Sequence, residues 1–196
     1  MSKEYLHDQL YDIRGYDVYA NHEVKKSLLL SFFPDTIIDM INDMSNVTSA
    51  FYGFLLKNIG ETLGKEKINE FSEKLFYNLG KLKTEQALIK DAELYRDTRA
   101  FAVVAISAIY NASPEYIFSI DEFTAEKTVL TLTGVDRYYR VCHQVGIDEY
   151  VKWPTLLPFI EAIKDTLQVN ASIEYNLSPY TEDYKTNCVF TFKKIN

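Results

Sequence analysis

The sequence predicts an α+β fold, in which a helical N-terminal region and a long, buried central helix pack on a C-terminal four-stranded antiparallel sheet made of two hairpins separated by helices. Only 7 Gly and 5 Pro occur in 196 residues, which favours long elements. Apolar residues recur at helical spacing as far as residue 110, and beyond residue 115 they alternate with polar residues in short segments. Helices gathered early in the chain and hairpins gathered late indicate α+β rather than a parallel α/β sheet.

Four helices are expected in the first 83 residues. They are expected to begin near Asn21, Pro34, Thr48 and residue 65. Asn and Thr are residue types that cap helices, and the fixed φ of Pro suits a first turn. The third helix is expected to end at Gly60 and Gly64 and the fourth at Gly80, because glycine readily leaves helical geometry.

The central helix is expected to begin at Thr84 and to end at Asn111, Ser113 and Pro114. Its first half is amphipathic, whereas its second half, from Ala100 to Ala108, has almost no polar side chain. A helix that is apolar on every side is buried on every side. We therefore expect this helix to lie at the centre of the fold.

Two pairs of strands are expected after the central helix. The first pair covers 116–120 and 128–133, and the second covers 172–177 and 186–193. Between the pairs, helical spacing returns over 136–145 and again from Pro154. We expect the two hairpins to form one sheet, with one face packed against the central helix.

The chain is expected to form a single domain over 1–196, with a helical subregion at 1–83 and the central helix plus sheet at 84–196. The net charge is −7 and the sequence contains no run of Lys or Arg, which disfavours nucleic-acid binding. No apolar run of 18 residues occurs, so we expect no membrane span. An N-terminus without a secretory signal, together with two cysteines, indicates free thiols and a cytoplasmic protein.

The layout from Thr84 to Asn196 resembles a superfamily that includes haem nitric-oxide-binding domains, 4-vinyl reductase domains and Golgi-transport tethering subunits. Vinyl-reductase-like chains often end on a cysteine followed by an aromatic residue in the last strand, and Cys188-Val189-Phe190 is similar. Aminothiazoline-carboxylate hydrolase-like proteins share this ending and carry a cysteine near the first strand–helix junction. The nearest thiol here, Cys142, lies about two turns into the following helix. The resemblance implies a sensor or ligand-binding module, a tethering-type homodimer, or cysteine chemistry.

No cofactor and no metal are expected. The haem-binding branch needs a proximal His on the helix before the sheet and a Tyr-x-Ser-x-Arg motif after it, and neither is present. Cys142 would be the alternative haem ligand. A structural zinc site needs about four nitrogen or sulfur ligands, which two cysteines and one nearby histidine do not supply.

Cys142 and Cys188 are the candidate catalytic residues, because a thiolate beside a base is a nucleophile. His143 adjoins Cys142, but neighbouring residues on a helix point about 100° apart. The structural alternative is that both cysteines are small buried side chains in apolar stripes.

The candidate ligand-binding residues are mostly cationic. They are Arg96, Arg99, Arg137, Tyr138, Arg140 and His143. If the central helix and the helix after Gly134 meet, these arginines form a cluster suited to a carboxylate or a phosphate. The structural alternative is pairing with internal acids such as Glu93, Asp97 and Asp136.

Three functions remain open on the sequence alone. The first is a binding or sensor module that holds a small apolar or anionic ligand between the central helix and the sheet. The second is a cysteine-dependent hydrolase of a small amide or cyclic thio-compound. The third is a dimeric scaffolding subunit.

Overall fold

The computed structural model describes residue 6 and residues 8–195. The chain divides into two compact units, Met1–Val47 and Thr48–Asn196. Helix α4 (Ile37–Leu63) carries residues of both units. The organisation as a single domain divided at residue 83 stays a prediction.

The first unit holds α2 (Tyr11–Arg14), α3 (His22–Ser31) and the start of α4. The Asn21 side chain accepts a hydrogen bond from the backbone N–H of Val24 at 3.0 Å, so the predicted cap of α3 is confirmed. α4 begins after Thr36, which exchanges reciprocal backbone–side-chain hydrogen bonds with Asp39. One helix of 27 residues therefore replaces the two that were expected to begin at Pro34 and Thr48.

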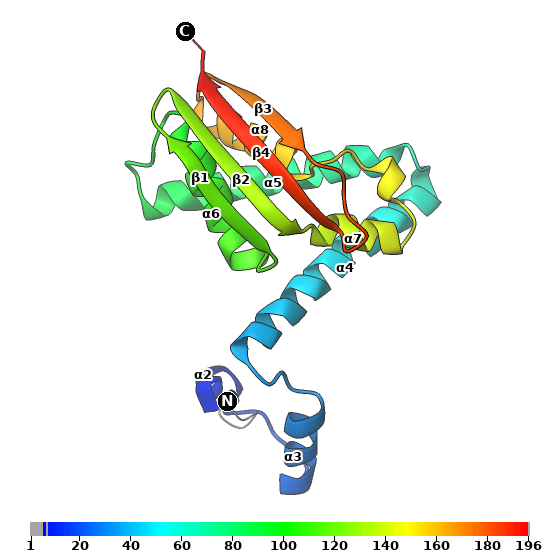
Figure 1. The fold of residues 1–196 in the computed structure, drawn as a ribbon. Coiled ribbons are helices and arrows are strands. Elements are labelled where there is room, and N and C mark those ends of the chain that lie inside the picture. The colour runs from blue at the N-terminus through cyan, green and yellow to red at the C-terminus, as the bar shows by residue number, and fades with distance from the viewer. Residues whose placement is uncertain (1–5, 7, 196) are drawn as a thin grey trace. The chain divides into compact units, whose positions relative to one another are not determined.

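The second unit holds the rest of α4 and all later elements (Figure 1). They are α5 (Lys67–Lys90), α6 (Arg99–Ala112), β1 (Tyr116–Phe123), β2 (Lys127–Val135), α7 (Arg137–Gln144), a 3₁₀ turn at Asp148–Tyr150, α8 (Leu156–Leu167), β3 (Ala171–Leu177) and β4 (Lys185–Lys194). None of the described helices is both long and apolar enough to cross a membrane.

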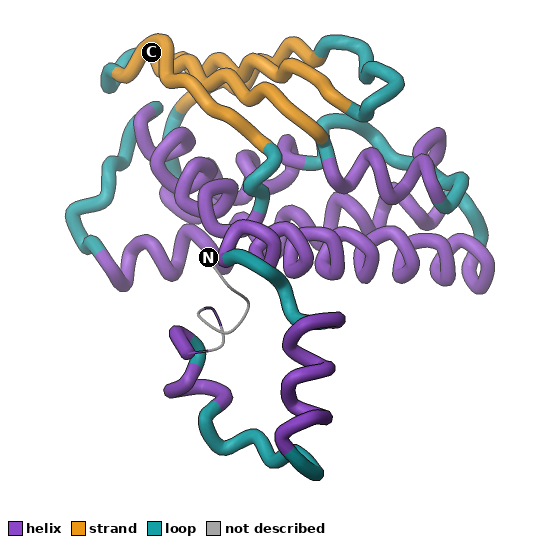
Figure 2. The backbone as a smooth tube through the Cα atoms, turned by 60° about the horizontal axis from the view of Figure 1, so that its bottom comes forward, coloured by secondary structure: helices purple, strands orange, loops and turns teal. Residues whose placement is uncertain are grey.

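The α+β fold class is confirmed. The four strands form one antiparallel sheet in the order β1-β2-β4-β3. The two predicted hairpins are β1–β2 and β3–β4, and the pairing of β2 with β4 joins them. The helices of this unit gather on one side of the sheet (Figure 2). The opposite face of β2 and β4 carries mainly polar side chains such as Thr131, Asn187 and Thr191.

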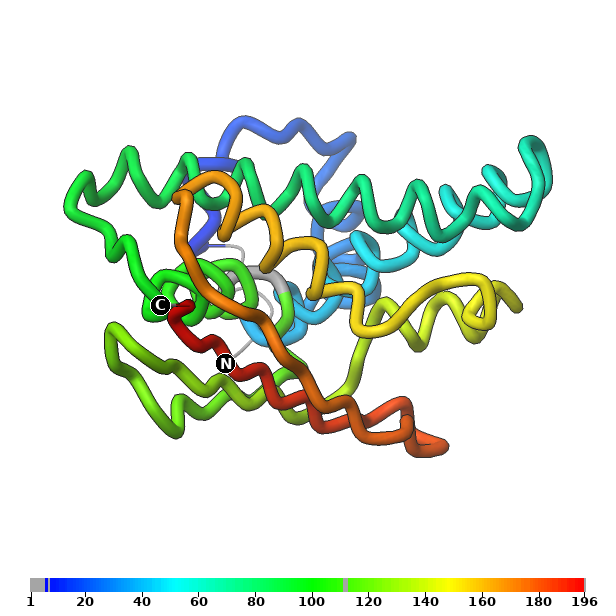
Figure 3. The backbone as a smooth tube through the Cα atoms, turned by 90° about the horizontal axis from the view of Figure 1, so that it is seen from above, coloured from blue at the N-terminus to red at the C-terminus, as the bar shows by residue number. Residues whose placement is uncertain are grey.

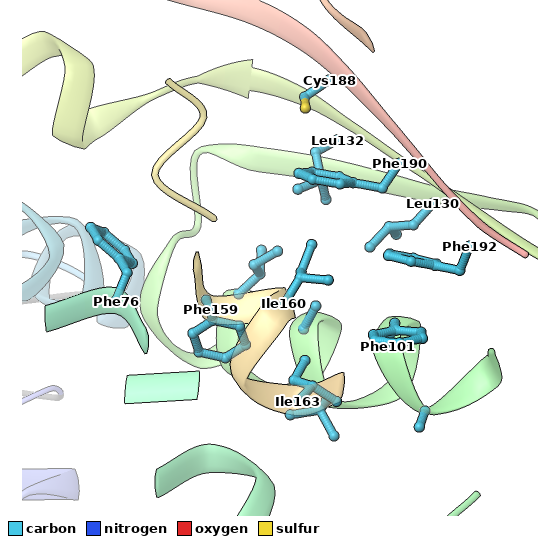
Figure 4. Packing of buried hydrophobic residues seen from close by; sticks show 14 of the residues in the cluster. Phe76, Phe101, Leu130, Leu132, Phe159, Ile160, Ile163, Cys188, Phe190 and Phe192 are labelled. Carbon is cyan, nitrogen blue, oxygen red and sulfur yellow. The ribbon is translucent and has the colours of Figure 1, made fainter. Parts of the chain in front are cut away.

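The core lies between the sheet and helices α6 and α8. Leu130, Phe190 and Phe192 point from the sheet toward the helices (Figure 4). Phe101 of α6 stacks on Phe192, with ring centroids 4.5 Å apart. Ile160 of α8 is fully buried in the same cluster. These contacts hold α6 and α8 against the sheet.

The prediction of one long central helix starting at Thr84 is wrong. Thr84 lies inside α5, where its hydroxyl donates to the carbonyl of Gly80 at 2.8 Å. α5 ends at Lys90, and the side chains of Asp91 and Asp97 then accept hydrogen bonds from nearby backbone N–H groups. These local bonds compete with helix geometry, so α6 begins only at Arg99.

The burial of α6 is also more limited than expected. Ala100, Phe101, Ala102, Val104 and Ala105 are enclosed. Beyond them the helix reaches the surface, because Ser107 is exposed and Tyr110 is 77% exposed. The first two turns are therefore largely enclosed, and farther along the helix Ile109 is still buried on the core side.

Gly80 does not end a helix, as was expected. It lies in the middle of α5 at the crossing with α8, which runs next to α5 (Figure 3). A Cβ on Gly80 would lie 2.3 Å from the carbonyl oxygen of Phe159 and 2.9 Å from Cβ of Ala162. The missing side chain thus allows the backbones of α5 and α8 to approach closely.

Candidate binding pocket

An apolar pocket of about 400 Å³ lies in the second unit among α4, α5, α6, α7 and α8. Its walls include Leu75 and Leu79 of α5, Ile109 of α6, and Leu156 and Phe159 of α8. Each comes from an apolar stripe of its helix, so the packing of these helices creates the pocket. Phe51 of α4, which is 73% exposed, lies at its open side.

Three aromatic rings form one corner of the pocket. Tyr52, Phe76 and Tyr138 meet edge to face, with ring centroids 5.0–5.5 Å apart. The Tyr52 hydroxyl lies 2.7 Å from the hydroxyl of Ser72, so its polar atom is satisfied in the interior. Burial raises the pKa of Tyr52. The Tyr52 phenol therefore stays protonated at neutral pH.

The charged residues that line the pocket are Lys83 and Arg137, and no carboxylate is among its lining residues. Arg137 is 2% exposed. Its Nη1 donates to Oγ1 of Thr48 at 2.9 Å, and its Nη2 donates to the hydroxyl of Tyr138 at 2.6 Å. The guanidinium therefore connects α7 to α4 beside the pocket.

The space expected between the central helix and the sheet is almost filled. A cavity of about 50 Å³ remains there, lined on the sheet side by Leu132, Cys188 and Phe190. This cavity and the larger pocket share Phe76, Ile109, Ser113, Tyr138 and Leu156, so they adjoin. Room for a ligand thus lies among the helices rather than under the sheet.

Asp136, which lines the small cavity, is the polar centre of this region. It caps α7, because its Oδ1 accepts hydrogen bonds from the backbone N–H groups of Tyr138 and Tyr139 at 3.0 Å. Its Oδ2 accepts from the hydroxyl of Tyr180 at 3.0 Å. Burial raises the pKa of Asp136, although these donors act in the opposite direction.

Sequence reasoning treated Asp136 only as a partner for arginine. A usable signal was present, since an Asp between a strand and an amphipathic helix is a typical helix cap. Its contact with Tyr180, 44 residues later, depends on the tertiary fold and has no local signal.

The two candidate catalytic thiols are buried. Burial, followed by the negative charge of Asp136, raises the pKa of both Cys142 and Cys188 to about 12. Both thiols are therefore protonated at neutral pH, which disfavours a nucleophilic role. His143 lies at the surface, where its Nδ1 is 3.2 Å from Oδ2 of Asp148. The catalytic assignment of the cysteines stays a prediction.

The candidate arginines do not form one cluster. Arg99 is the first residue of α6 and Arg96 lies in the loop before it, whereas Arg137 lines the pocket together with Ile109 and Ser113 from the other end of α6. Arg99 pairs with Asp97, with Nη2 and Oδ2 2.6 Å apart. This is the structural alternative expected from the sequence.

Of the other candidates, Arg140 pairs with Glu115 at 3.8 Å and Arg96 is exposed. His143 stacks on Tyr139 with centroids 5.9 Å apart. Arg137 and Tyr138 are the members of the predicted ligand-binding set that line the larger pocket. The apolar walls and Lys83 were not predicted as site residues, because they come from helices whose packing the sequence does not specify.

The pocket does not fit haem. Its lining residues include no His, Cys or Met, and the hydroxyls of its two tyrosines, Tyr52 and Tyr138, already contact Ser72 and Arg137. Cys188 lines the cavity of about 50 Å³, which is far too small for a porphyrin. Among the residues that the structure describes, no group of three or more His, Cys, Asp or Glu is placed to hold a metal ion.

No protein-family model and no curated protein matches the sequence. Among solved structures, the chain is similar to the phenol-responsive sensory domain of the transcription activator PoxR with phenol, at 12% identity over 73% of each chain and a TM-score of 0.49. It is also similar to a Cs H-NOX mutant, at 11% identity over 100% of this chain and 97% of the other, with a TM-score of 0.38.

The unliganded Fe(II) H-NOX protein from K. algicida gives 15% identity, the same shares of the two chains and a TM-score of 0.36. These structures are H-NOX domains and a sensory domain. The similarity to aminothiazoline-carboxylate hydrolase-like proteins stays a prediction.

Proposed function

We propose that this chain is a small-molecule-binding module of the sensor type, which holds an apolar or anionic ligand in the pocket among α4, α5, α6, α7 and α8. The observation that carries the proposal is the pocket itself, with a volume of about 400 Å³ and a lining that is apolar except at a few positions. Ligand pockets typically measure about 300–1,000 Å³ and combine apolar walls with a few polar groups.

The pocket also lies beside a hydrogen-bonded contact whose geometry would change when a ligand binds. Arg137 and Tyr138 line the pocket, and Arg137 bonds Thr48 of α4. A ligand pressing on Tyr138 would alter the geometry of this link between α7 and α4. Cores respond to such shifts by moving between discrete packings, which is the basis of a sensor.

A neutral apolar probe tests the binding function. Isothermal titration calorimetry with 4-phenylbutan-1-ol is expected to show saturable, one-to-one binding to the whole chain. Leu79→Trp fills the pocket and is expected to weaken this binding about tenfold or more, because the indole takes the volume that the probe needs. The matched control is Ile89→Trp, on the same helix at a position that is 86% exposed.

Two results would contradict the binding function. One is the absence of saturable binding to the unmodified chain. The other is equal affinity in Leu79→Trp and in the unmodified chain, which would place any bound probe elsewhere.

A dimeric scaffolding function is the second candidate. Within the second unit, helices α4 and α5 expose large apolar side chains: Phe51, Phe54, Leu55, Phe71 and Leu82. Large exposed apolar patches commonly mark protein–protein contacts. The predicted homodimer would bury this face.

Light scattering during size-exclusion chromatography of the chain tests whether it forms a dimer. A dimer is expected at high concentration, and Phe54→Glu is expected to shift it toward monomer because a carboxylate would be buried in the interface. Lys81→Glu on the exposed surface of α5 is the control for added charge. A chain that stays monomeric at high concentration would refute the scaffold.

A further inference from the structure

Lys83 is the residue of the pocket that the proposed function leaves without a role. It is half-buried and lines the pocket with Leu75 and Leu79. The three residues recur every four positions, so they lie on the same face of α5. Lys83 follows Leu75 by eight positions, which corresponds to a rise of about 12 Å along the helix.

The charge around Lys83 is unbalanced. It forms no salt bridge with any residue in the described part of the chain. The other cation at the pocket, Arg137, is held by Thr48 and Tyr138. No Asp or Glu lines the pocket, so the charged side chains in its walls are the cations Lys83 and Arg137.

We infer that the ligand of this pocket is an amphipathic carboxylate, whose apolar body packs along Leu75 and Leu79 and whose carboxylate pairs with Lys83. The inference rests on the proposed function, because it names the class of ligand for the same pocket. An apolar wall that ends in a cation is complementary to a molecule with an apolar body and an anionic end. The spacing along α5 suits a ligand of about 12 Å.

The structural alternative is that Lys83 only packs its methylene stem on the apolar wall while its ammonium stays in water. In that case the pocket would bind neutral and anionic molecules equally. The two readings therefore differ in the effect of the ligand's charge and in the effect of removing the lysine charge.

The test compares 4-phenylbutanoate with 4-phenylbutan-1-ol, which share the phenylbutyl body and differ in the charged end. Calorimetric titrations use the whole chain, Lys83→Gln and the control Lys81→Gln, which removes an exposed charge two residues away. The unmodified chain is expected to bind the carboxylate about tenfold tighter than the alcohol, the scale of a charged hydrogen bond. Lys83→Gln is expected to abolish this preference by weakening carboxylate binding about tenfold, whereas Lys81→Gln is expected to keep the preference.

Equal binding of acid and alcohol to the unmodified chain would overturn the inference, and so would a carboxylate preference that survives in Lys83→Gln. Either result leaves the proposed binding function standing, because the alcohol still reports an apolar pocket. Absence of binding by both probes would overturn the inference together with the proposed function.

Discussion

Cys142 and Cys188 show how burial changes the chemistry that a sequence suggests. Each is a possible nucleophile by residue type, but the environment raises both pKa values from 9.0 to about 12. The sequence already contained the reason, since both cysteines lie in apolar stripes. What it lacked was the position of Asp136, whose charge adds to the effect of burial on both thiols.

We expect both thiols to resist alkylation in the folded chain. At pH 7.5, iodoacetamide should modify Cys142 and Cys188 far more slowly in buffer than in concentrated urea, because the thiolate is the reacting species and folding removes it. Peptide mass spectrometry after timed quenching measures the two rates separately. If either cysteine reacts as fast in the folded chain as in concentrated urea, the hydrolase hypothesis regains its support.

Asp136 is expected to make stability depend on pH. Its pKa is raised in the folded chain, so the folded state binds the proton more tightly than the unfolded state. The stability that proton binding to Asp136 contributes is fully present below the ordinary Asp pKa of about 3.9. It is lost as pH rises through the raised pKa of the folded state. Asp136→Asn keeps the α7 cap, since Asn also caps helices, and removes the titration.

Urea unfolding at several pH values above 4 measures this effect. The free energy of unfolding of the unmodified chain should decrease as pH rises. The Asp136→Asn chain should lack this decrease. Asp183→Asn, which alters an exposed carboxylate, serves as the control. Identical pH profiles for the unmodified chain and Asp136→Asn would show that Asp136 titrates normally.

At the scale of elements, the strands were more predictable than the helices. A strand that faces both a core and solvent alternates along its length, so 128–133 and 186–193 were found to within two residues of β2 and β4. Helix boundaries depended on contacts distant in sequence. Gly80 is an ordinary helix stop by residue type, yet it lies inside α5, where the backbone of α8 packs closely against it.

Gly80→Ala tests this close crossing. In an exposed helix the change stabilises by about 1 kcal/mol. Here we expect it to destabilise the chain by about 1–3 kcal/mol, because the new methyl would overlap the backbone of Phe159 and separate α5 from α8.

The measurement is urea unfolding monitored by circular dichroism, with Gly60→Ala in α4 as the control. There the nearest atom to a new Cβ is the terminal Cδ1 of Ile68, which can move more easily than backbone. A Gly80→Ala chain as stable as the unmodified one would mean that the crossing is looser than the structure indicates.

At the scale of the whole chain, the sequence predicted the layers but not the pocket. Polar–apolar alternation and the apolar segment at 100–108 were enough to predict one sheet packed on a buried helix. The order β1-β2-β4-β3 was not predicted, because two hairpins can be joined along different edges. The pocket arises where α4 and α5 meet α7 and α8. Its formation depends on how side chains fill, or leave unfilled, the space between helices, which no local pattern encodes.

We propose that the second unit binds a small amphipathic molecule among its helices. Methyl NMR of the Ile, Leu and Val side chains during titration with 4-phenylbutanoate would detect this binding at the residues involved. Saturable shifts are predicted for Leu79, Ile109 and Leu156, which line the pocket, with no shift for Val189 on the opposite face of the sheet. Unchanged resonances at those three pocket residues, or shifts centred on Val189, would contradict the claim.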